Sequence, residues 1–284
     1  MKIQEVKPQA QTELSALPFW LPMNVHAADS GENMKEKRVI ITGGTSGIGL
    51  AAASMFLEQG ARVVLAGRSS GRGEEALQSL PPGVRSRAAY VPCDVAKPED
   101  CRSLVEDGTA WLGGVDVLVN SAGIYLEQPI ESMTEELFDR VMDVNVKGTY
   151  FMCRYAVPEL RKEKDAAIVN VSSDAGLHGN YGCTAYCASK GAVALFTRSL
   201  ALEVASFGLR VNCVCPGDIL TPMTERQLAE GNSREETLRE MQSVYPMGRI
   251  GRVEEAASVI VFLASPAASF VTGAAWSVDG GLTA

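Results

Sequence analysis

The residues best suited to chemistry are Tyr186 and Lys190, which stand four positions apart near the start of a long helical pattern. At that spacing two side chains project from one face of a helix, about one turn apart. A phenol has an ordinary pKa of about 10, and a neighbouring ammonium favours its ionised form, so such a tyrosine can exchange a proton with an alcohol or carbonyl oxygen. Ser173 follows a short strand pattern just upstream. An isolated Tyr-x-x-x-Lys pair is more often an ordinary exposed helix pair, so the assignment depends on the rest of the chain.

The elements that must position these residues alternate between strands and helices. Regular alternation predicts a sheet that is covered by helices on both faces, so we expect one three-layer, doubly wound α/β domain. Short apolar runs predict strands at 39–42, 62–66, 88–92, 115–119, 168–171, 210–215 and 275–278, and longer periodic stretches predict helices at 50–59, 98–111, 134–160, 184–207 and 252–263.

A glycine-rich turn, Thr42-Gly-Gly-Thr-Ser-Gly-Ile-Gly49, follows the first predicted strand and opens a helix. Glycines let the backbone turn tightly and approach a pyrophosphate closely, and the free amides at the helix start donate to its negative charge. The context between a strand and a helix predicts a dinucleotide site. The contact residues that we expect in this turn are Gly43, Thr45, Ser46, Gly47, Ile48 and Gly49.

The end of the second predicted strand indicates which dinucleotide binds. In a doubly wound sheet this position reaches the adenosine ribose, where an acidic residue binds the 2′-hydroxyl and a basic residue accepts a 2′-phosphate. The chain has Gly67 and then Arg68 here. The sequence therefore favours NADP(H). NAD(H) is the alternative, because Arg68 could instead be a solvated loop charge and Ser46 supplies no second positive charge in the glycine turn.

Small or polar residues also follow the other predicted strands, where open parallel sheets bind their ligands. They are Asp94 and Val95, the run Asn120-Ser-Ala-Gly123, and the segment from Pro216 to Thr221. A further polar residue, Asn145, lies inside an otherwise apolar helical stretch, where a side-chain amide is unusual unless it has hydrogen-bond partners or a function. It is either a satisfied core amide or part of a bent helix that positions a water.

Composition excludes several other classes of function. The 284 residues carry a formal net charge of -8 and a sequence pI of about 5.0, which argues against nucleic acid or an anionic membrane as the main partner. The seven cysteines show neither a Cys-x-x-Cys motif nor a Cys/His metal spacing, so we expect free thiols and no metal site. No stretch of about eighteen apolar residues predicts a transmembrane helix. These features predict a cytoplasmic protein.

Two segments stand outside the alternating pattern. Residues 1–33 mix Gln, Pro and Glu with one apolar patch that Pro18 and Pro22 interrupt, so we expect an irregular leader or subunit-contacting arm rather than a signal peptide. Residues 34–284 are then a single catalytic domain. Within it, 222–248 is rich in Glu, Arg, Met and Gln, and we expect this segment to form a mobile helical lid.

Taken together, these motifs resemble the short-chain dehydrogenase/reductase family, and within it the 3-oxoacyl-carrier-protein reductases, from Met34 to the C-terminus. One departure is Ser121, which stands where the family has a second Asn; because this turn acts largely through its backbone, we expect little loss. The resemblance implies a Rossmann-like sheet of about seven strands, hydride transfer with a nicotinamide nucleotide, and a homotetramer built partly from the helices at 134–160 and 184–207. The motifs that carry it are Thr42-Gly-x-x-x-Gly-x-Gly49, Asp94, Asn120-Ser-Ala-Gly123, Asn145, Ser173, Tyr186-x-x-x-Lys190 and Pro216-Gly217.

The resemblance also implies a role for each catalytic residue. Tyr186 would be the general acid in carbonyl reduction and the base in alcohol oxidation, and Ser173 would hydrogen-bond the substrate oxygen. Lys190 would hold the nicotinamide ribose hydroxyls and lower the phenol pKa. Asn145 would support a water that continues the proton path to Lys190. His178, in the loop after Ser173, is expected to be a wall of the substrate pocket rather than a catalyst.

On the cofactor side, Tyr186 and Lys190 would also contact the nucleotide. The resemblance implies further contacts at the adenine from Asp94 and Val95, at the ribose from Asn120, Ala122 and Gly123, and at the carboxamide from Pro216, Gly217, Ile219 and Thr221.

The alternative function is a non-catalytic nucleotide-binding or sensing protein on the same fold. Such a protein would be expected to have lost part of the tetrad Asn145, Ser173, Tyr186 and Lys190, which is intact here. The expected partner is a small carbonyl or alcohol substrate. The sequence leaves a 3-oxoacyl thioester, a steroid, a sugar and a simple secondary alcohol all open.

Overall fold

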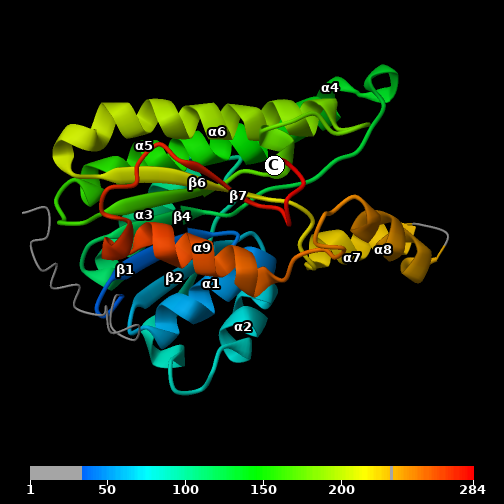
Figure 1. Ribbon diagram of the computed structural model, residues 1–284. Coiled ribbons are helices and arrows are strands. Elements are labelled where there is room, and N and C mark those ends of the chain that lie inside the picture. The colour runs from blue at the N-terminus through cyan, green and yellow to red at the C-terminus, as the bar shows by residue number, and fades with distance from the viewer. Residues whose placement is uncertain (1–33, 231–232) are drawn as a thin grey trace, which may run out of the picture. The chain divides into compact units, whose positions relative to one another are not determined.

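The computed structural model describes residues 34–230 and 233–284, which contain a seven-stranded, all-parallel sheet (Figure 1). The strands stand in the order β3-β2-β1-β4-β5-β6-β7. The chain therefore builds outward from β1 in one direction and then, from β4, in the other, as the predicted doubly wound sheet requires. The strands are β1 (Arg38–Thr42), β2 (Arg62–Gly67), β3 (Ala88–Pro92), β4 (Val117–Asn120), β5 (Ala167–Val171), β6 (Arg210–Pro216) and β7 (Ala275–Val278).

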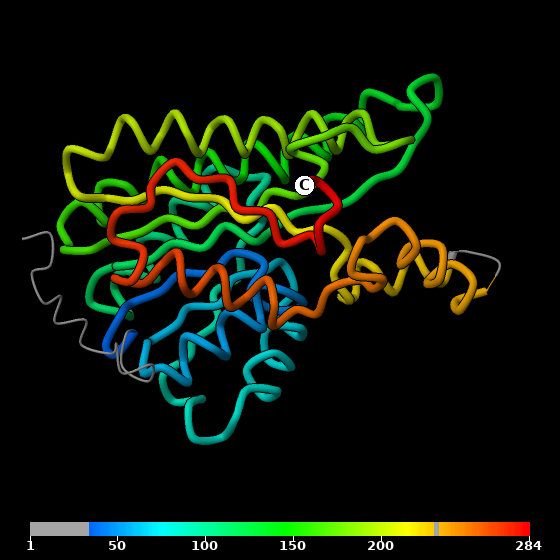
Figure 2. Tube along the Cα trace, in the orientation of Figure 1, coloured from blue at the N-terminus to red at the C-terminus, as the bar shows by residue number. Residues whose placement is uncertain are grey.

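Helices cover both faces of this sheet. Figures 1 and 2 show α5 and α6 on one side and α1 and α9 on the other. The three-layer architecture predicted from the sequence is confirmed. The helices are α1 (Gly47–Glu58), α2 (Ser70–Ser79), α3 (Pro98–Leu112), α4 (Glu135–Met142), α5 (Gly148–Leu160), α6 (Thr184–Val204), α7 (Pro222–Glu230), α8 (Arg234–Ser243) and α9 (Val253–Ala264).

Successive residues of the central strands contribute to two separate apolar cores, because side chains alternate between the faces of a sheet. Ile40 belongs to the core that α3, α5 and α6 share, whereas Val39 and Ile41 belong to the core of α1 and α9. All seven residues of β6 are buried. Burial on both faces is why β1, β2 and β4, at the centre of the sheet, read as short apolar runs and could be found from the sequence.

One predicted helix needs correction, and one helix was not predicted. The helix expected at 134–160 is interrupted by a π-helix at Asp143–Lys147, which separates α4 from α5. The sequence also gave no sign of α2, whose residues include two glycines and no apolar period; it is capped by the Ser69 side chain, which accepts from the Arg72 amide. The helical pattern of the sequence therefore did not reveal the π-helix or α2.

The structure describes one of the two segments that lie outside the alternation of strands and helices. The expected leader, residues 1–33, lies outside the described residues, while Met34 is fully buried. The expected lid contains α7 and α8, which an ion pair between Arg234 and Glu225 joins at 2.7 Å. The mobility of the lid stays a prediction. Within residues 34–230 and 233–284, no helix combines the length and hydrophobicity that a membrane crossing requires.

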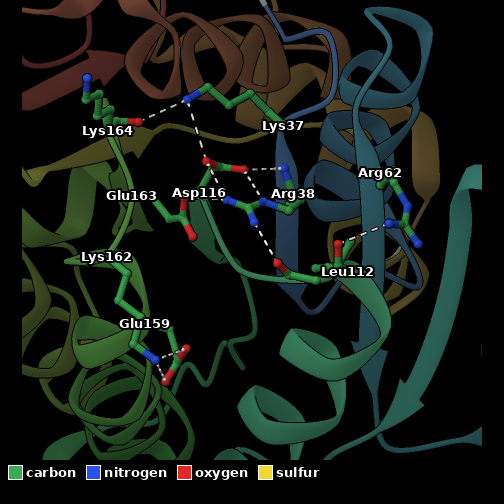
Figure 3. Close-up of polar contacts among 10 residues, drawn as sticks. Lys37, Arg38, Arg62, Leu112, Asp116, Glu159, Lys162, Glu163 and Lys164 are labelled. Carbon is green, nitrogen blue, oxygen red and sulfur yellow. Dashed lines mark hydrogen bonds and ion pairs between the residues drawn. The ribbon is translucent and has the colours of Figure 1, made fainter.

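A charged network fixes the strands at the edge opposite the glycine turn (Figure 3). The Arg38 guanidinium contacts the Asp116 carboxylate at 2.8 Å and Glu163 at 2.6 Å, and it donates to the Gly113 carbonyl at 2.7 Å. Asp116 also accepts from the Arg38 backbone amide at 2.9 Å. Hydrogen bonds to these two carboxylates raise the pKa of Arg38 above its ordinary value. The network joins the start of β1 to the approaches of β4 and β5.

Replacing Asp116, which is 6% exposed, should therefore destabilise the fold. Asp116→Asn removes the charge that the Arg38 guanidinium faces, and we expect the free energy of unfolding to fall by about 1.5–3 kcal/mol, as is typical of a hydrogen bond to a charged group. Urea denaturation measures this change. Asp107→Asn, on the exposed face of α3, is the matched control and should change stability by less than about 0.5 kcal/mol. Equal stability of the two variants would contradict the prediction.

Candidate active site

The tetrad residues come from three elements that meet at the carboxyl edge of the sheet. Ser173 follows β5, Tyr186 and Lys190 lie in the first two turns of α6, and Asn145 lies in the π-helix before α5. A Cβ placed on Gly123, after β4, would lie 3.3 Å from both Asn145 Oδ1 and Lys190 Nζ. The structure therefore brings Asn145 and Lys190 together around a glycine that leaves room between them.

Lys190 is 5% exposed, and its ammonium is held by the sheet. Its Nζ donates to the Val171 carbonyl at 2.9 Å and lies 5.8 Å from the centroid of the Tyr186 ring. The Ser172 hydroxyl donates to the Lys190 carbonyl at 2.8 Å, which fixes the first turns of α6 against the end of β5. The side chain is thus anchored at both its backbone and its charged end.

The pKa values of this pair differ from the expectation. Burial lowers the pKa of Lys190 to about 8, although the Cys215 and Cys213 thiols act in the opposite direction. Burial also raises the pKa of Tyr186 above its ordinary value, and a hydrogen bond with Ser173 only partly offsets that rise. Loss of hydration is the largest cause of this rise, and the effect of Lys190 on the phenol pKa stays a prediction.

The side chain of Asn145 is a satisfied amide, 1% exposed. Its Oδ1 accepts from the Ile124 amide at 2.9 Å, and its Nδ2 donates to the Ile124 carbonyl and to Ser189 Oγ, each at 3.0 Å. Ser189 in turn donates to the Tyr186 carbonyl at 2.7 Å. Asn145 therefore ties the loop after β4 to the turn that carries Tyr186, and its support of a water stays a prediction.

Ser173 lies beside a carboxylate that the sequence analysis did not single out. The Ser173 hydroxyl donates to Asp174 Oδ1 at 2.7 Å and accepts from the Ala175 amide at 3.2 Å. Asp174 is 6% exposed, and its Oδ2 lies 3.3 Å from His178 Nε2. The signal that could have found this pair is the acidic residue immediately after Ser173.

Two more residues close to Tyr186 were also not expected from the sequence. The Tyr125 ring packs edge-on against Tyr186, with ring centroids 5.0 Å apart. The Tyr125 hydroxyl lies 3.2 Å from Cys183 Sγ, and it donates to Glu127 Oε2 at 2.9 Å. Neither Tyr125 nor Cys183 belongs to a motif, so only the folded structure identifies them.

The glycine turn has the shape that a dinucleotide pyrophosphate needs. Gly43 and Gly47 have φ values of +65° and +53°, and a Cβ on Gly49 would overlap the Gly43 carbonyl oxygen. Ser46 precedes α1 without a side-chain cap, and the first turn of α1 has no acidic residue. The first amides of α1 are therefore open to an anion, and the residues present fit the expected nucleotide.

The flanking residues predicted for the nucleotide lie around this turn. A Cβ on Gly43 would lie 2.7 Å from the Ala122 amide, and one on Gly47 would lie 3.3 Å from Thr221 Cγ2. The loops after β4 and β6 thus close on the turn from two sides. A Cβ on Gly67 would lie 3.0 Å from Thr45, and the next residue, Arg68, is exposed.

Other predicted contacts have their side chains engaged within the protein. Asn120 Nδ2 donates to Asn170 Oδ1 at 2.9 Å, so the amide nitrogen of Asn120 is used within the sheet. Val95 is 8% exposed and packs against Gly148, and Asp94 Oδ1 accepts from the Ala96 amide at 3.2 Å. The roles of these residues toward the nucleotide stay predictions, as do those of Ile48, Pro216, Gly217 and Ile219.

Comparison with known proteins agrees with the geometry. A family model described as enoyl-(acyl carrier protein) reductase matches residues 43–283. The chain is 41% identical over 249 residues to a 3-oxoacyl-[acyl-carrier-protein] reductase of Thermotoga maritima, covering 88% of this chain and 98% of that protein. It is 38% identical over 253 residues to an L-fucose dehydrogenase of Oryctolagus cuniculus, covering 89% and 87%.

A solved structure gives the same answer for the fold. The short-chain dehydrogenase/reductase of Brucella melitensis described as a glucose/ribitol dehydrogenase has a TM-score of 0.82 and 36% identity, covering 89% of this chain and 99% of that one. The chain therefore belongs to the short-chain dehydrogenase/reductase family of NAD(P)-dependent oxidoreductases.

Proposed function

We propose that the chain transfers a hydride between a nicotinamide nucleotide and a small carbonyl or secondary alcohol substrate, with Tyr186 as the general acid and base. The observation that carries this proposal is the meeting of Ser173, Tyr186 and Lys190 at the sheet edge that also holds the glycine turn. When bound, the nicotinamide supplies or accepts the hydride. The protein must then orient the substrate and move one proton.

Tyr186 is the group that moves this proton. Its phenol is half-buried beside Ser173, and the two side chains share a hydrogen bond. In carbonyl reduction the neutral phenol donates its proton to the substrate oxygen, and in alcohol oxidation the phenolate accepts it. The raised pKa keeps Tyr186 protonated, which suits the donor role directly.

Lys190 positions the nucleotide and supplies a positive charge near Tyr186. An ammonium has three hydrogens, and the one that contacts the Val171 carbonyl leaves two to face the pocket beside Gly123. These two would hold the ribose hydroxyls of the nucleotide. Any group that stabilises the charge of Lys190 also favours the Tyr186 phenolate.

We also propose a homotetramer and a cytoplasmic location. Large apolar side chains are exposed along α5 and α6, where a partner subunit could cover them: Tyr150 is 50% exposed, Leu195 67% and Leu202 84%. All seven cysteines are unpaired, which fits a reducing compartment.

The activity is tested with a panel of ketones and alcohols, following nicotinamide absorbance with each cofactor. Tyr186→Phe should retain nucleotide binding and lose about 10²–10⁴-fold in kcat, because general acid–base catalysis contributes that much. Tyr181→Phe is the matched control, since Tyr181 is 99% exposed in the loop before α6. A Tyr186→Phe enzyme with unchanged kcat would contradict the assignment.

The buried ammonium of Lys190 should appear in the pH dependence of stability. Its pKa is about 8 in the folded protein and about 10.4 in an unfolded chain, so between these values the unfolded state binds more protons and stability rises with pH. As the pH rises, the free energy of unfolding of the nucleotide-free parent should therefore increase relative to that of Lys190→Met, by up to about 1.4 kcal/mol per pH unit. Titratable groups that do not interact with Lys190 contribute equally to both proteins and cancel in this difference. Parallel curves between pH 8 and 10 would refute the prediction.

Arg68 should determine the choice of cofactor. The planar guanidinium can donate to a 2′-phosphate, and a charge-assisted hydrogen bond of about 1.5–3 kcal/mol corresponds to about ten- to over a hundredfold in affinity. We expect the parent to prefer NADPH, and Arg68→Ala to lose affinity for NADPH but not for NADH, in fluorescence titrations. Arg102→Ala, exposed on α3, is the control. If both cofactors weaken alike, Arg68 does not bind the phosphate and NAD(H) is the partner.

A further inference from the structure

Two cysteines flank Tyr186 at the start of α6. Cys183 is the N-cap of this helix and Cys187 lies in its first turn, so Tyr186 stands between them in the chain. The Cys187 amide donates to the Cys183 carbonyl at 2.7 Å, which closes that turn. Residues at this spacing are neighbours on a helix surface. The two thiols are therefore joined through the same turn that carries Tyr186.

The sulfur of Cys187 is held against the loop that ends in Cys183. The Cys183 amide donates to the Asn180 carbonyl at 3.2 Å, so residues 180–183 form a tight turn. The Asn180 amide in its turn donates to Cys187 Sγ at 3.4 Å. The two thiols lie near enough to influence each other, because Cys187 contributes to the raised pKa of Cys183.

The two thiols differ in their access to solvent. Cys183 is 2% exposed, whereas Cys187 is partly exposed. Burial raises the pKa of the Cys183 thiol, which keeps it in the protonated form that reacts slowly with oxidants. A soluble oxidant therefore meets Cys187 first, and Cys183 is the partner thiol behind it.

A second pair of thiols lacks this access. Cys213 Sγ and Cys215 Sγ lie 4.0 Å apart, but both residues are completely buried in β6. They also stand two positions apart in an extended strand, whose backbone is held by its neighbours on both sides. Reaction with an oxidant in solution is thus expected at the start of α6 and not within the sheet.

We infer that Cys183 and Cys187 are an oxidation site, at which a peroxide closes a disulfide and thereby stops turnover at Tyr186. This inference rests on the proposed function, because it concerns the regulation of the same site. The Cys187 sulfur attacks one peroxide oxygen, the O–O bond breaks, and a sulfenic acid and one water form. The Cys183 sulfur then displaces the sulfenic hydroxyl, which leaves with the thiol proton as a second water. Two thiols lose two hydrogens, and one hydrogen peroxide is reduced to two waters.

Closure of this disulfide must distort the first turn of α6. Cβ atoms one helical turn apart are about 5–6 Å from each other, and a disulfide needs about 3.5–4.5 Å. Cys183 and Cys187 must therefore approach each other by about 1–2 Å. The N-cap backbone of Cys183 is not helical, with φ −116° and ψ 29°, so the movement falls on this end of α6.

The distortion reaches Tyr186 by two routes. Tyr186 lies within the turn that is drawn together. The Cys183 sulfur also leaves the Tyr125 hydroxyl, 3.2 Å away, and the Tyr125 ring packs edge-on against Tyr186. A misplacement of about 1 Å in an active site can cost about 10²-fold in rate. Reduction by thiols reverses the change, as is usual for disulfides that form transiently in a reducing compartment.

The test treats the nucleotide-free parent with hydrogen peroxide and measures both mass and activity. Trypsin releases residues 165–190 as one peptide, which contains Cys183 and Cys187 and no other cysteine. We expect this peptide to lose two hydrogens and kcat to fall by about 10²-fold on a substrate that the panel identifies. Dithiothreitol should restore both values.

Variants of Cys187 separate the disulfide from other oxidative damage. Cys187→Ser and Cys187→Ala should keep the kcat of the reduced parent and should retain it after peroxide. Cys101→Ser, in α3, is the matched control and should lose activity as the parent does. Thermal melting before treatment checks that each variant is folded.

Each other outcome counts against a stated claim. An active parent whose peptide keeps its hydrogens overturns the inference and leaves the proposed function in place. The inference is also overturned by a disulfide that leaves kcat unchanged, by a loss that dithiothreitol does not restore, or by Cys187 variants that lose activity as the parent does or that both fail to fold. A reduced parent without turnover on any carbonyl or alcohol overturns the proposed function, while the peptide mass still decides whether the disulfide forms.

Discussion

The burial of the Lys190 ammonium is the constraint on which the site depends. A charge that is 5% exposed must have partners, and the first of these is the carbonyl of Val171 at the end of β5. The loop that follows is then drawn in: Ser172 donates to the Lys190 carbonyl, and a Cβ on Gly176 would lie 2.8 Å from that same oxygen. The position of Ser173, between these two residues, follows from the anchoring of α6.

A second polar network supports this arrangement from within the sheet. Asn120 donates to Asn170, Asn170 donates to Thr197, and Thr197 donates to the Val193 carbonyl, so that β4, β5 and α6 are joined in turn. These groups are almost fully buried, and each would cost free energy if its partner were lost. The network fixes the angle at which α6 approaches the sheet. It therefore fixes the direction in which Tyr186 and Lys190 project.

The sequence predicts those features that local patterns determine. β-branched runs located the strands, and the glycine spacing located the turn whose positive φ values at Gly43 and Gly47 the structure shows. The π-helix at 143–147 could not be found in this way, and the only local sign of the contact between Ser173 and Asp174 is that the two residues are adjacent. Each depends on contacts with distant residues or on the orientation of a side chain. Neither produces a periodic pattern in the sequence. Asn145 was recognised as unusual, but its bonds to Ile124 and Ser189 could only be seen in the fold.

The order in which Tyr186 and Lys190 lose their protons determines when an ammonium stands beside the phenol. Lys190, with a pKa of about 8, is neutral before the phenol begins to ionise. No positive charge then remains to stabilise the phenolate. The two titrations are therefore coupled: whatever restores the charge of Lys190 also lowers the pKa of Tyr186. The same burial that raises the phenol pKa makes the site responsive to a ligand that binds against Lys190.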